Sequence, residues 1–282
     1  IVPARRPGFV RAHALSRVGA YLAAPPTADA PGNPFAGEAR ALGRVTRELH
    51  EALASGADAP DFAPVRATEA DVRAWADATR RSVATAYDLL AARGETLDRM
   101  SQAPARALLT RRVRVLDRVG EIATDVSDRR LAGARIRHHG DYHLGQVLRT
   151  GAGEWMIIDF EGEPARPLVE RRAKHSPLRD VAGMLRSFAY AAAAGAMAAG
   201  GLGVNAMVES RSARWEREAR AAFLDGYFGA GRGSVMLPRG ASDAAPLVAL
   251  FEIEKIFYEL AYELNNRPAW AWIPLRGIAR LF

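Results

Sequence analysis

The chain has 282 residues, of which 49% are apolar, so it can bury a sizeable core and is not a disordered protein. It contains no cysteine, which excludes a disulfide framework, a thiolate nucleophile and a zinc site with cysteine ligands. The net charge of +7 comes from arginines scattered among acidic residues, with only two lysines, Lys174 and Lys255, so it does not predict a nucleic-acid partner.

The first half of the chain is predicted to be helical. Residues 1–21 are expected to form a strand remnant and a short helix, followed by a loop rich in Pro and Gly up to residue 34. A helix is predicted over 35–54, because apolar side chains recur there at steps of three and four residues. Thr68 and Asp71 have the spacing of a capping box, so we expect a helix over 69–92 and a further long helix over 102–126.

Between residues 135 and 159 the pattern changes to short extended segments, at 135–138, 146–149 and 154–158, separated by loops. Ser176 and Pro177 then predict the start of a helix that runs to about Ala199, and further helices are expected over 209–228 and 243–265. The stretch 188–204 is rich in Ala and Gly and lacks the apolar content of a membrane-spanning helix, so no membrane is expected and a cytoplasmic location is predicted.

The extended region contains the residues with the most specific chemistry. Asp141 lies in the loop His-Gly-Asp-Tyr-His, Gln146 follows it five residues later, and Asp159 ends an apolar strand. Kinases of the protein-kinase fold have this order: a loop carboxylate that accepts the proton of the attacking hydroxyl, an amide ligand five residues later, and an aspartate after a strand. Gln146 stands where the general pattern has asparagine, but either amide offers the hard oxygen that Mg²⁺ prefers.

Three neighbours of this set have open roles. His139 is expected to brace the loop through hydrogen bonds. His143 is either a second brace or a substrate contact. Glu161 is a candidate for assisting the metal, with a solvated loop carboxylate as the alternative.

Two stretches of this region resemble the maltokinases, including the maltokinase domain fused to trehalose synthase. They read H-G-D-Y-H-L-G-Q-V-L and I-I-D-F-E-G-E-P-A-R-P-L-V-E-R-R-A-K-H-S-P-L-R-D-V-A-G-M-L-R-S-F. The C-terminal run F-E-I-E-K-I-F-Y-E-L-A-Y-E-L-N-N-R-P-A-W is similar to the same family. The broader group is that of aminoglycoside-phosphotransferase-like kinases. The resemblance implies ATP-dependent phosphorylation of maltose to maltose 1-phosphate for alpha-glucan synthesis, with ATP and Mg²⁺ as cofactors and trehalose synthase as a partner.

Carried over by position, the resemblance implies that Asp141 is the catalytic base and that Gln146 and Asp159 bind Mg²⁺. It also implies that Asp180 holds the backbone of the catalytic loop from the following helix. Arg172 and Lys174 are candidates for contacts with the bound phosphate or substrate, with solvated surface charge as the alternative.

A sugar site needs aromatic platforms flanked by hydrogen-bonding side chains. One C-terminal segment combines the two kinds of side chain at helical spacing, and its candidate substrate-binding residues are Tyr258, Glu259, Tyr262, Glu263, Asn266, Arg267 and Trp270. The alternative is a core-facing stripe.

The predicted fold class is α+β and mainly helical: the C-terminal, catalytic lobe of a protein-kinase-like fold with a small β-hairpin island. Residues 1–34 are expected to form a linker and the start of this lobe, and residues 35–282 the catalytic lobe with its substrate-binding helices. No lysine precedes Lys174 and no glycine-rich phosphate loop precedes Asp141, so the N-terminal lobe is expected to be largely absent and the chain to be a fragment.

Three alternatives to a maltokinase remain open at this point. The first is a kinase for another sugar. The second is a degenerate kinase domain that acts as a binding or scaffold partner. The third is a metal-dependent hydrolase that uses His138, His139, Asp141 and His143 as ligands, although no second cluster of such residues completes the site.

Overall fold

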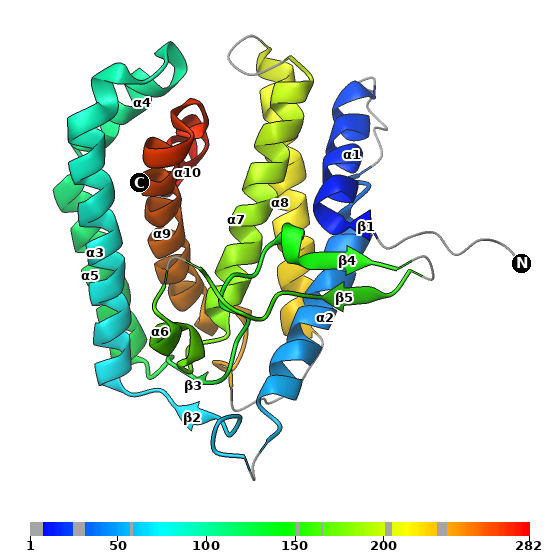
Figure 1. Ribbon diagram of the computed structural model, residues 1–282, viewed down its shortest axis with the longest axis vertical. Coiled ribbons are helices and arrows are strands. Elements are labelled where there is room, and N and C mark those ends of the chain that lie inside the picture. The colour runs from blue at the N-terminus through cyan, green and yellow to red at the C-terminus, as the bar shows by residue number, and fades with distance from the viewer. Residues whose placement is uncertain are drawn as a thin grey trace, which may run out of the picture. The chain divides into compact units, whose positions relative to one another are not determined.

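The computed structural model describes residues 8–24, 32–56, 59–150, 153–164, 166–200, 205–229 and 236–282. Within these ranges the protein is mostly helical with a few short strands, as the α+β prediction requires (Figure 1). The chain divides into two compact units, and each is assembled from two separate segments. The first unit comprises residues 1–64 and 136–234, and the second comprises residues 65–135 and 235–282.

The first unit contains an antiparallel sheet of three short strands in the order β1-β4-β5, together with helices. Phe9 of β1 lies opposite Leu148, and Val147 of β4 lies opposite Ile157. Its elements are β1 (Gly8–Phe9), α1 (Val10–Ala23), α2 (Ala36–Leu53), β4 (Val147–Arg149), β5 (Trp155–Ile157), α6 (Leu168–Arg172), α7 (Leu178–Ala198) and α8 (Ala206–Gly229).

Helix α2 packs closely against α8, because glycines at the contact leave no side chain between the two backbones. A Cβ atom on Gly43 would lie 2.1 Å from the Phe223 carbonyl oxygen, and one on Gly226 would lie 2.0 Å from the Arg40 carbonyl oxygen. Helix α7 has the length and composition of a membrane span, but 61% of its most apolar window is buried within the protein, as expected of a core helix.

The second unit contains a two-stranded antiparallel ribbon, in which Val65 lies opposite Arg135, and a group of helices. Helix α3 packs against α9 through Trp75 and Phe251, whose ring centroids are 5.4 Å apart, and through Tyr87 and Phe257, at 5.9 Å. Its elements are β2 (Val65–Arg66), α3 (Glu69–Arg93), α4 (Arg99–Leu109), α5 (Arg112–Asp128), β3 (Ala134–Arg135), α9 (Ala241–Asn266) and α10 (Trp272–Leu281).

Most sequence-predicted helices are confirmed to within a few residues, including the helices over 35–54 and 69–92. The capping box before α3 is present in both directions. The Asp71 backbone N–H donates to the Thr68 hydroxyl oxygen at 3.3 Å, and the Thr68 backbone N–H donates to the Asp71 carboxylate at 2.8 Å.

The prediction of one helix over 102–126 is wrong, because the chain forms α4 and α5 with a break between them. Asp98 begins α4 earlier than expected by accepting a hydrogen bond from the Ser101 backbone N–H at 2.8 Å. At the break, the Thr110 hydroxyl donates to the Ala107 carbonyl at 2.9 Å, a local bond that competes with the helical ladder. The short helices α6 and α10 were not predicted.

Candidate active site

The loop that carries Asp141 and the end of strand β5 meet in the first unit. The Gln146 side-chain amide donates to the Asp159 carboxylate, with 2.7 Å between Nε2 and Oδ2. The backbone N–H of Ile158, immediately before Asp159, donates to the Gln146 carbonyl oxygen at 3.0 Å. The two predicted metal ligands, 13 residues apart in sequence, therefore lie side by side.

His139 joins the same two segments through its ring. It is 1% exposed. Its Nε2 lies 2.8 Å from the Ile158 carbonyl oxygen, and its Nδ1 accepts a hydrogen bond from the Asp141 backbone N–H at 3.3 Å. Because a carbonyl oxygen only accepts, the hydrogen of this bond is on Nε2. His139 has the bracing contacts predicted for it, and both of its nitrogens are occupied by them.

Asp180, at the start of α7, holds the backbone of this loop. Its carboxylate accepts hydrogen bonds from the backbone N–H groups of His139, at 2.7 Å, and of Gly140, at 2.9 Å. Burial by itself would raise the pKa of Asp180, but the neighbouring His138, which gains a proton only at low pH, and the hydrogen bond from His50 hold it well below its ordinary value. Asp180 is therefore a buried carboxylate in the position that the resemblance implied.

Asp159 has a left-handed backbone conformation, with φ at 66°. Such a conformation is costly for a residue with a Cβ atom and is tolerated best by Gly, Asn and Asp. Gly140, at φ 84°, and Gly162, at φ 74°, adopt similar conformations at the same site, and a Cβ atom on Gly140 would lie 3.3 Å from the Gly162 Cα. The chain turns sharply on both sides of the predicted metal ligands.

His143 faces Asp141 across 3.9 Å, between Nε2 and Oδ2. Its Nδ1 accepts a hydrogen bond from the Gly145 backbone N–H at 2.9 Å, which caps the short turn that leads to Gln146. The side chains of His143 and Asp141 are 40% and 21% exposed, so both remain open to solvent. The structure leaves His143 with one nitrogen used as a brace and the other directed at the candidate base.

The candidates for phosphate or substrate contacts have different surroundings. The Lys174 ammonium donates to the carbonyl oxygens of Pro60, at 2.5 Å, and Ala63, at 2.6 Å, so it anchors a loop and is not a freely solvated charge. Glu161 and Arg172 are exposed. Their backbone carbonyls accept hydrogen bonds from the guanidinium groups of Arg171 and Arg137, respectively.

The candidate sugar-binding residues lie in the second unit, on α9 and the turn after it. Glu263 is 1% exposed and forms a two-point ion pair with Arg267, at 2.6 and 3.0 Å. The Arg267 guanidinium also lies over the rings of Tyr262, at 5.4 Å, and Trp270, at 5.2 Å. The Asn266 amide donates to the Tyr262 carbonyl oxygen at 2.9 Å.

The other two candidates on α9, Tyr258 and Glu259, are partly exposed. Glu263 is buried and paired with Arg267. Its carboxylate therefore holds Arg267 in place and is not exposed to a ligand.

The structure adds residues that the sequence did not single out. His50 of α2 approaches Asp180, with 3.2 Å between Nε2 and Oδ2, and Tyr227 of α8 contacts the other nitrogen of His50 at 2.8 Å. Thr46 contacts the hydroxyl of Tyr142, next to Asp141, at 2.9 Å. One signal was available: a threonine and a histidine interrupt the predicted apolar face of the helix over 35–54.

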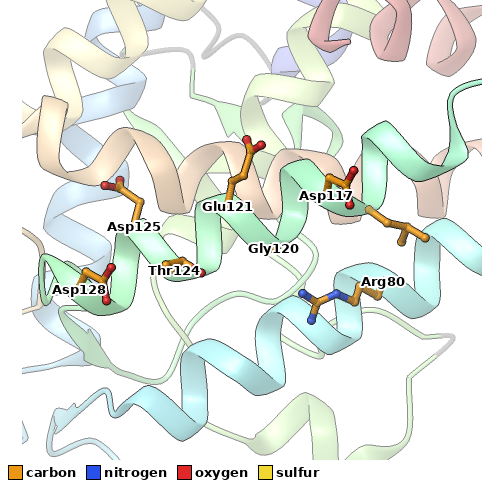
Figure 2. A pocket seen from close by; sticks show the side chains of 8 residues that line it. Arg80, Asp117, Gly120, Glu121, Thr124, Asp125 and Asp128 are labelled. Carbon is orange, nitrogen blue, oxygen red and sulfur yellow. The ribbon is translucent and has the colours of Figure 1, made fainter.

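A cavity of about 870 Å³ lies elsewhere, in the second unit, between α3 and α5. Figure 2 shows Asp117, Glu121, Asp125 and Asp128 projecting from α5, with Arg80 on α3. Glu121 and Asp125 form surface ion pairs with neighbouring arginines, at 3.0 and 3.2 Å, and none of the predicted site residues lines the cavity. These features are those of a solvated acidic helix face.

No group of three or more His, Cys, Asp or Glu residues that could hold a metal ion is found among the described residues. The hydrolase alternative is therefore not supported: His139, one of its four ligands, uses both ring nitrogens within the protein.

No family model matches the chain. The curated proteins that are similar to most of it include two glucosamine kinases. The glucosamine kinase of Mycolicibacterium smegmatis (strain ATCC 700084 / mc(2)155) is 34% identical over 235 residues, which cover 83% of this chain and 51% of that protein. The glucosamine kinase of Streptacidiphilus jiangxiensis is 28% identical, with 83% of this chain and 46% of that protein covered. The chain thus spans about half the length of the curated relatives it matches.

Solved structures of glucosamine kinases have the same fold over nearly the whole chain. One of them, in crystal form B, matches with a TM-score of 0.75 at 23% identity and covers 99% of this chain and 60% of that protein. Another, a glucosamine kinase in complex with glucosamine, ADP and inorganic phosphate, matches with a TM-score of 0.73 at 22% identity and covers 100% of this chain and 58% of that protein. The chain therefore has the fold of the part of these proteins that it covers.

Proposed function

We propose that this chain is the catalytic lobe of an ATP-dependent sugar kinase and that glucosamine is its acceptor. The observation that carries the proposal is the contact between Gln146 and Asp159 at a strand end, tied through His139 to the loop of Asp141. An amide and two carboxylates in this arrangement suit phosphoryl transfer, in which the protein positions the nucleophile and holds the metal and phosphates.

Asp141 would accept the proton of the sugar hydroxyl while the oxygen of that hydroxyl bonds to the γ-phosphorus of ATP. The bond between the γ-phosphorus and the oxygen that bridges it to the β-phosphorus breaks, and ADP leaves with the electron pair. The partial exposure of Asp141 leaves its carboxylate accessible to a substrate hydroxyl. His139 fixes the backbone N–H of Asp141 and so limits the directions that the carboxylate can take.

Mg²⁺ is the metal that such chemistry implies, and the residues present fit it. Asp159 supplies a carboxylate, and the adjacent Gln146 amide supplies a carbonyl oxygen once its two terminal atoms exchange places by rotation. Bound there, the metal would neutralise charge on the phosphates. With only two ligands from the protein, Mg²⁺ would keep water and phosphate oxygens as its other ligands, as it usually does in proteins.

The choice of glucosamine rests on the relatives. The two curated relatives described above are glucosamine kinases, and one solved structure of the same fold contains glucosamine, ADP and inorganic phosphate. These relatives favour glucosamine over maltose, which the resemblance to the maltokinases implied. Maltose is the second acceptor to test, and a cytoplasmic location stays a prediction.

The test is a phosphoryl-transfer assay with ATP and Mg²⁺ against glucosamine, N-acetylglucosamine, glucose and maltose. It is run on this chain and on any longer polypeptide encoded with it. Asp141→Asn keeps the shape of the side chain but removes the base, so we expect turnover to fall by about 10² to 10⁴-fold.

Asp117→Asn, on the acidic face of α5, is the matched control and should leave turnover unchanged. Equal activity of Asp141→Asn and the wild type would remove Asp141 from the mechanism. If no sugar is phosphorylated while ATP or a sugar still binds, the alternative of a degenerate binding domain gains support.

A further inference from the structure

Helix α2 carries two fully buried polar side chains where its pattern calls for apolar ones. Thr46 and His50 are both 0% exposed and are four residues apart, so they lie on the same face of the helix. Burying polar groups is costly unless they are hydrogen-bonded, and both have specific partners. Through these partners, hydrogen bonds connect α2 to the residues before Asp141 and to the residue after it.

The first path runs from α8 through α2 and α7 to the loop before Asp141. The Tyr227 hydroxyl contacts His50 Nδ1 at 2.8 Å, and His50 Nε2 contacts Asp180 Oδ2 at 3.2 Å. The Asp180 carboxylate in turn accepts the backbone N–H groups of His139 and Gly140. Three donors therefore share one buried carboxylate, and His50 supplies the only side-chain donor among the three.

The proton positions along this path follow from the partners. A carboxylate accepts, so His50 Nε2 donates to Asp180, and in the tautomer with its proton on Nε2 the other nitrogen, Nδ1, accepts from the Tyr227 hydroxyl. Burial raises the pKa of Tyr227 far above its ordinary value, which keeps that hydroxyl protonated as a donor. As a donor to Nδ1, Tyr227 matches the tautomer of His50 that donates to Asp180 from Nε2.

The second path reaches the residue after Asp141. The Thr46 hydroxyl donates to the Leu42 carbonyl at 2.8 Å, so it accepts the hydrogen of the Tyr142 hydroxyl at 2.9 Å. Tyr142 is buried and the backbone of the neighbouring Gly140 is held by Asp180. The residues before and after Asp141 are thus fixed from one face of one helix.

We propose that α2 positions the catalytic base: His50, with Tyr227, acts on Asp141 through Asp180, and Thr46 acts on Asp141 through Tyr142. The proposal rests on the proposed function, since it takes Asp141 as the base. His50, Tyr227 and Thr46 are fully buried, so each is a positioning residue and acts through another side chain. Because small displacements of a catalytic group cost large factors in rate, loss of either path should lower kcat more than it changes KM.

The kinetic test compares His50→Leu, which removes both hydrogen bonds, with His50→Gln, whose amide can donate to Asp180 and accept from Tyr227. It also compares Thr46→Val with Thr46→Ser, and includes Tyr227→Phe. We expect kcat to fall about 10 to 100-fold in His50→Leu and less in Tyr227→Phe and Thr46→Val, with KM within about twofold and recovery in His50→Gln and Thr46→Ser.

Thr79→Val is the control. Thr79 is also a fully buried helical threonine, and its hydroxyl donates to the Trp75 carbonyl at 3.0 Å, but it belongs to the second unit. A second control places His50→Leu in an Asp141→Asn background, where it should cause no further loss because the base through which it acts is gone. A full additional loss in that background would overturn the proposal.

Amide hydrogen exchange tests the same paths without any substrate. We expect faster exchange at His139 and Gly140 in His50→Leu and Tyr227→Phe, with exchange across α7 unchanged. Unchanged exchange at His139 and Gly140, or an equal rise throughout the first unit, would contradict the proposal. If no variant or wild type phosphorylates a sugar, the proposed function fails while the exchange still decides whether α2 holds the loop.

Discussion

Asp159 combines a candidate metal-binding role with an unfavourable backbone conformation. Its φ of 66° would cost an alanine about 1 to 2 kcal/mol, whereas glycine adopts it freely. We therefore expect Asp159→Gly to be more stable than Asp159→Ala by about 1 kcal/mol, as measured by denaturant unfolding. Both variants lack the carboxylate, so both should lose phosphoryl transfer.

The same pair of substitutions at Glu48, an exposed position inside α2, should show the reverse order, with alanine more stable than glycine by about 1 kcal/mol. Equal stability of the two Asp159 variants would show that the left-handed conformation is not retained in solution.

His138 makes stability depend on pH. Burial lowers its pKa to about 4, although Asp180 opposes this, and its Nδ1 is buried without a hydrogen-bond partner among the described residues. Burial also holds the pKa of the adjacent His175 well below its ordinary value. Both rings are therefore neutral in the folded protein at pH values where they are protonated in the unfolded chain.

Between about pH 4 and 6.5 the unfolded chain binds more protons than the folded protein does. The contribution of His138 to the free energy of unfolding is therefore complete above pH 6.5 and is lost as the pH falls toward 4. Its size is roughly 3 kcal/mol over that window. In His138→Leu, the free energy of unfolding should depend less steeply on pH between about pH 4.5 and 6, as measured by urea unfolding. The decrease in slope should correspond to about one proton fewer taken up on unfolding. An unchanged slope would mean that His138 is already protonated in the folded state.

At the scale of single elements, Gly183 allows α7 to lie against the catalytic loop. A Cβ atom there would approach the Tyr142 carbonyl oxygen to 2.7 Å, a backbone atom that cannot move away by rotation. Gly183→Ala should therefore destabilise the protein by about 1 to 3 kcal/mol and also lower kcat, because the loop must shift. Thermal unfolding and the sugar-kinase assay measure the two effects.

Gly19, in the middle of α1, is the matched control, since a Cβ atom there would meet nothing within 4 Å. Gly19→Ala should raise stability by about 0.5 to 1 kcal/mol through helix propensity alone. Equal effects of the two substitutions would show that α7 has room to move away from the loop.

The sequence predicted the long helices well, because each carries its own periodic apolar face and the capping box before α3 is a local signal. The prediction failed where single side-chain hydrogen bonds or packing between helices decide where a helix begins and ends. The hydroxyl of Thr110 and the cap from Asp98 divide one periodic segment into α4 and α5, and α10 gains its order by packing against α4 and α9.

The candidate site shows the same division. Asp141, Gln146 and Asp159 were found because they are close in sequence and their spacing is specific. His50 and Tyr227 were missed because they come from helices 177 residues apart in sequence, and only tertiary packing brings their side chains together. A polar residue on an apolar helical face was a sign of such packing, but it did not identify the partner.

For the whole molecule, the division into two units could not have been predicted from composition. Residues 65–135 interrupt the first unit, and the second unit is completed only by residues 235–282. Apolar periodicity shows that α3 and α9 each need a partner, but it does not show that they pack on one another through Trp75 and Phe251. The predicted division at residue 34 was drawn from loop composition alone.

This interrupted connectivity has a consequence for protein synthesis. Helix α3 leaves the ribosome well before α9 is translated, and at ordinary elongation rates the delay is on the order of ten seconds. During that interval the apolar face of α3 that includes Trp75 has no α9 to cover it. A nascent chain of this protein therefore presents a defined aromatic segment to cotranslational chaperones.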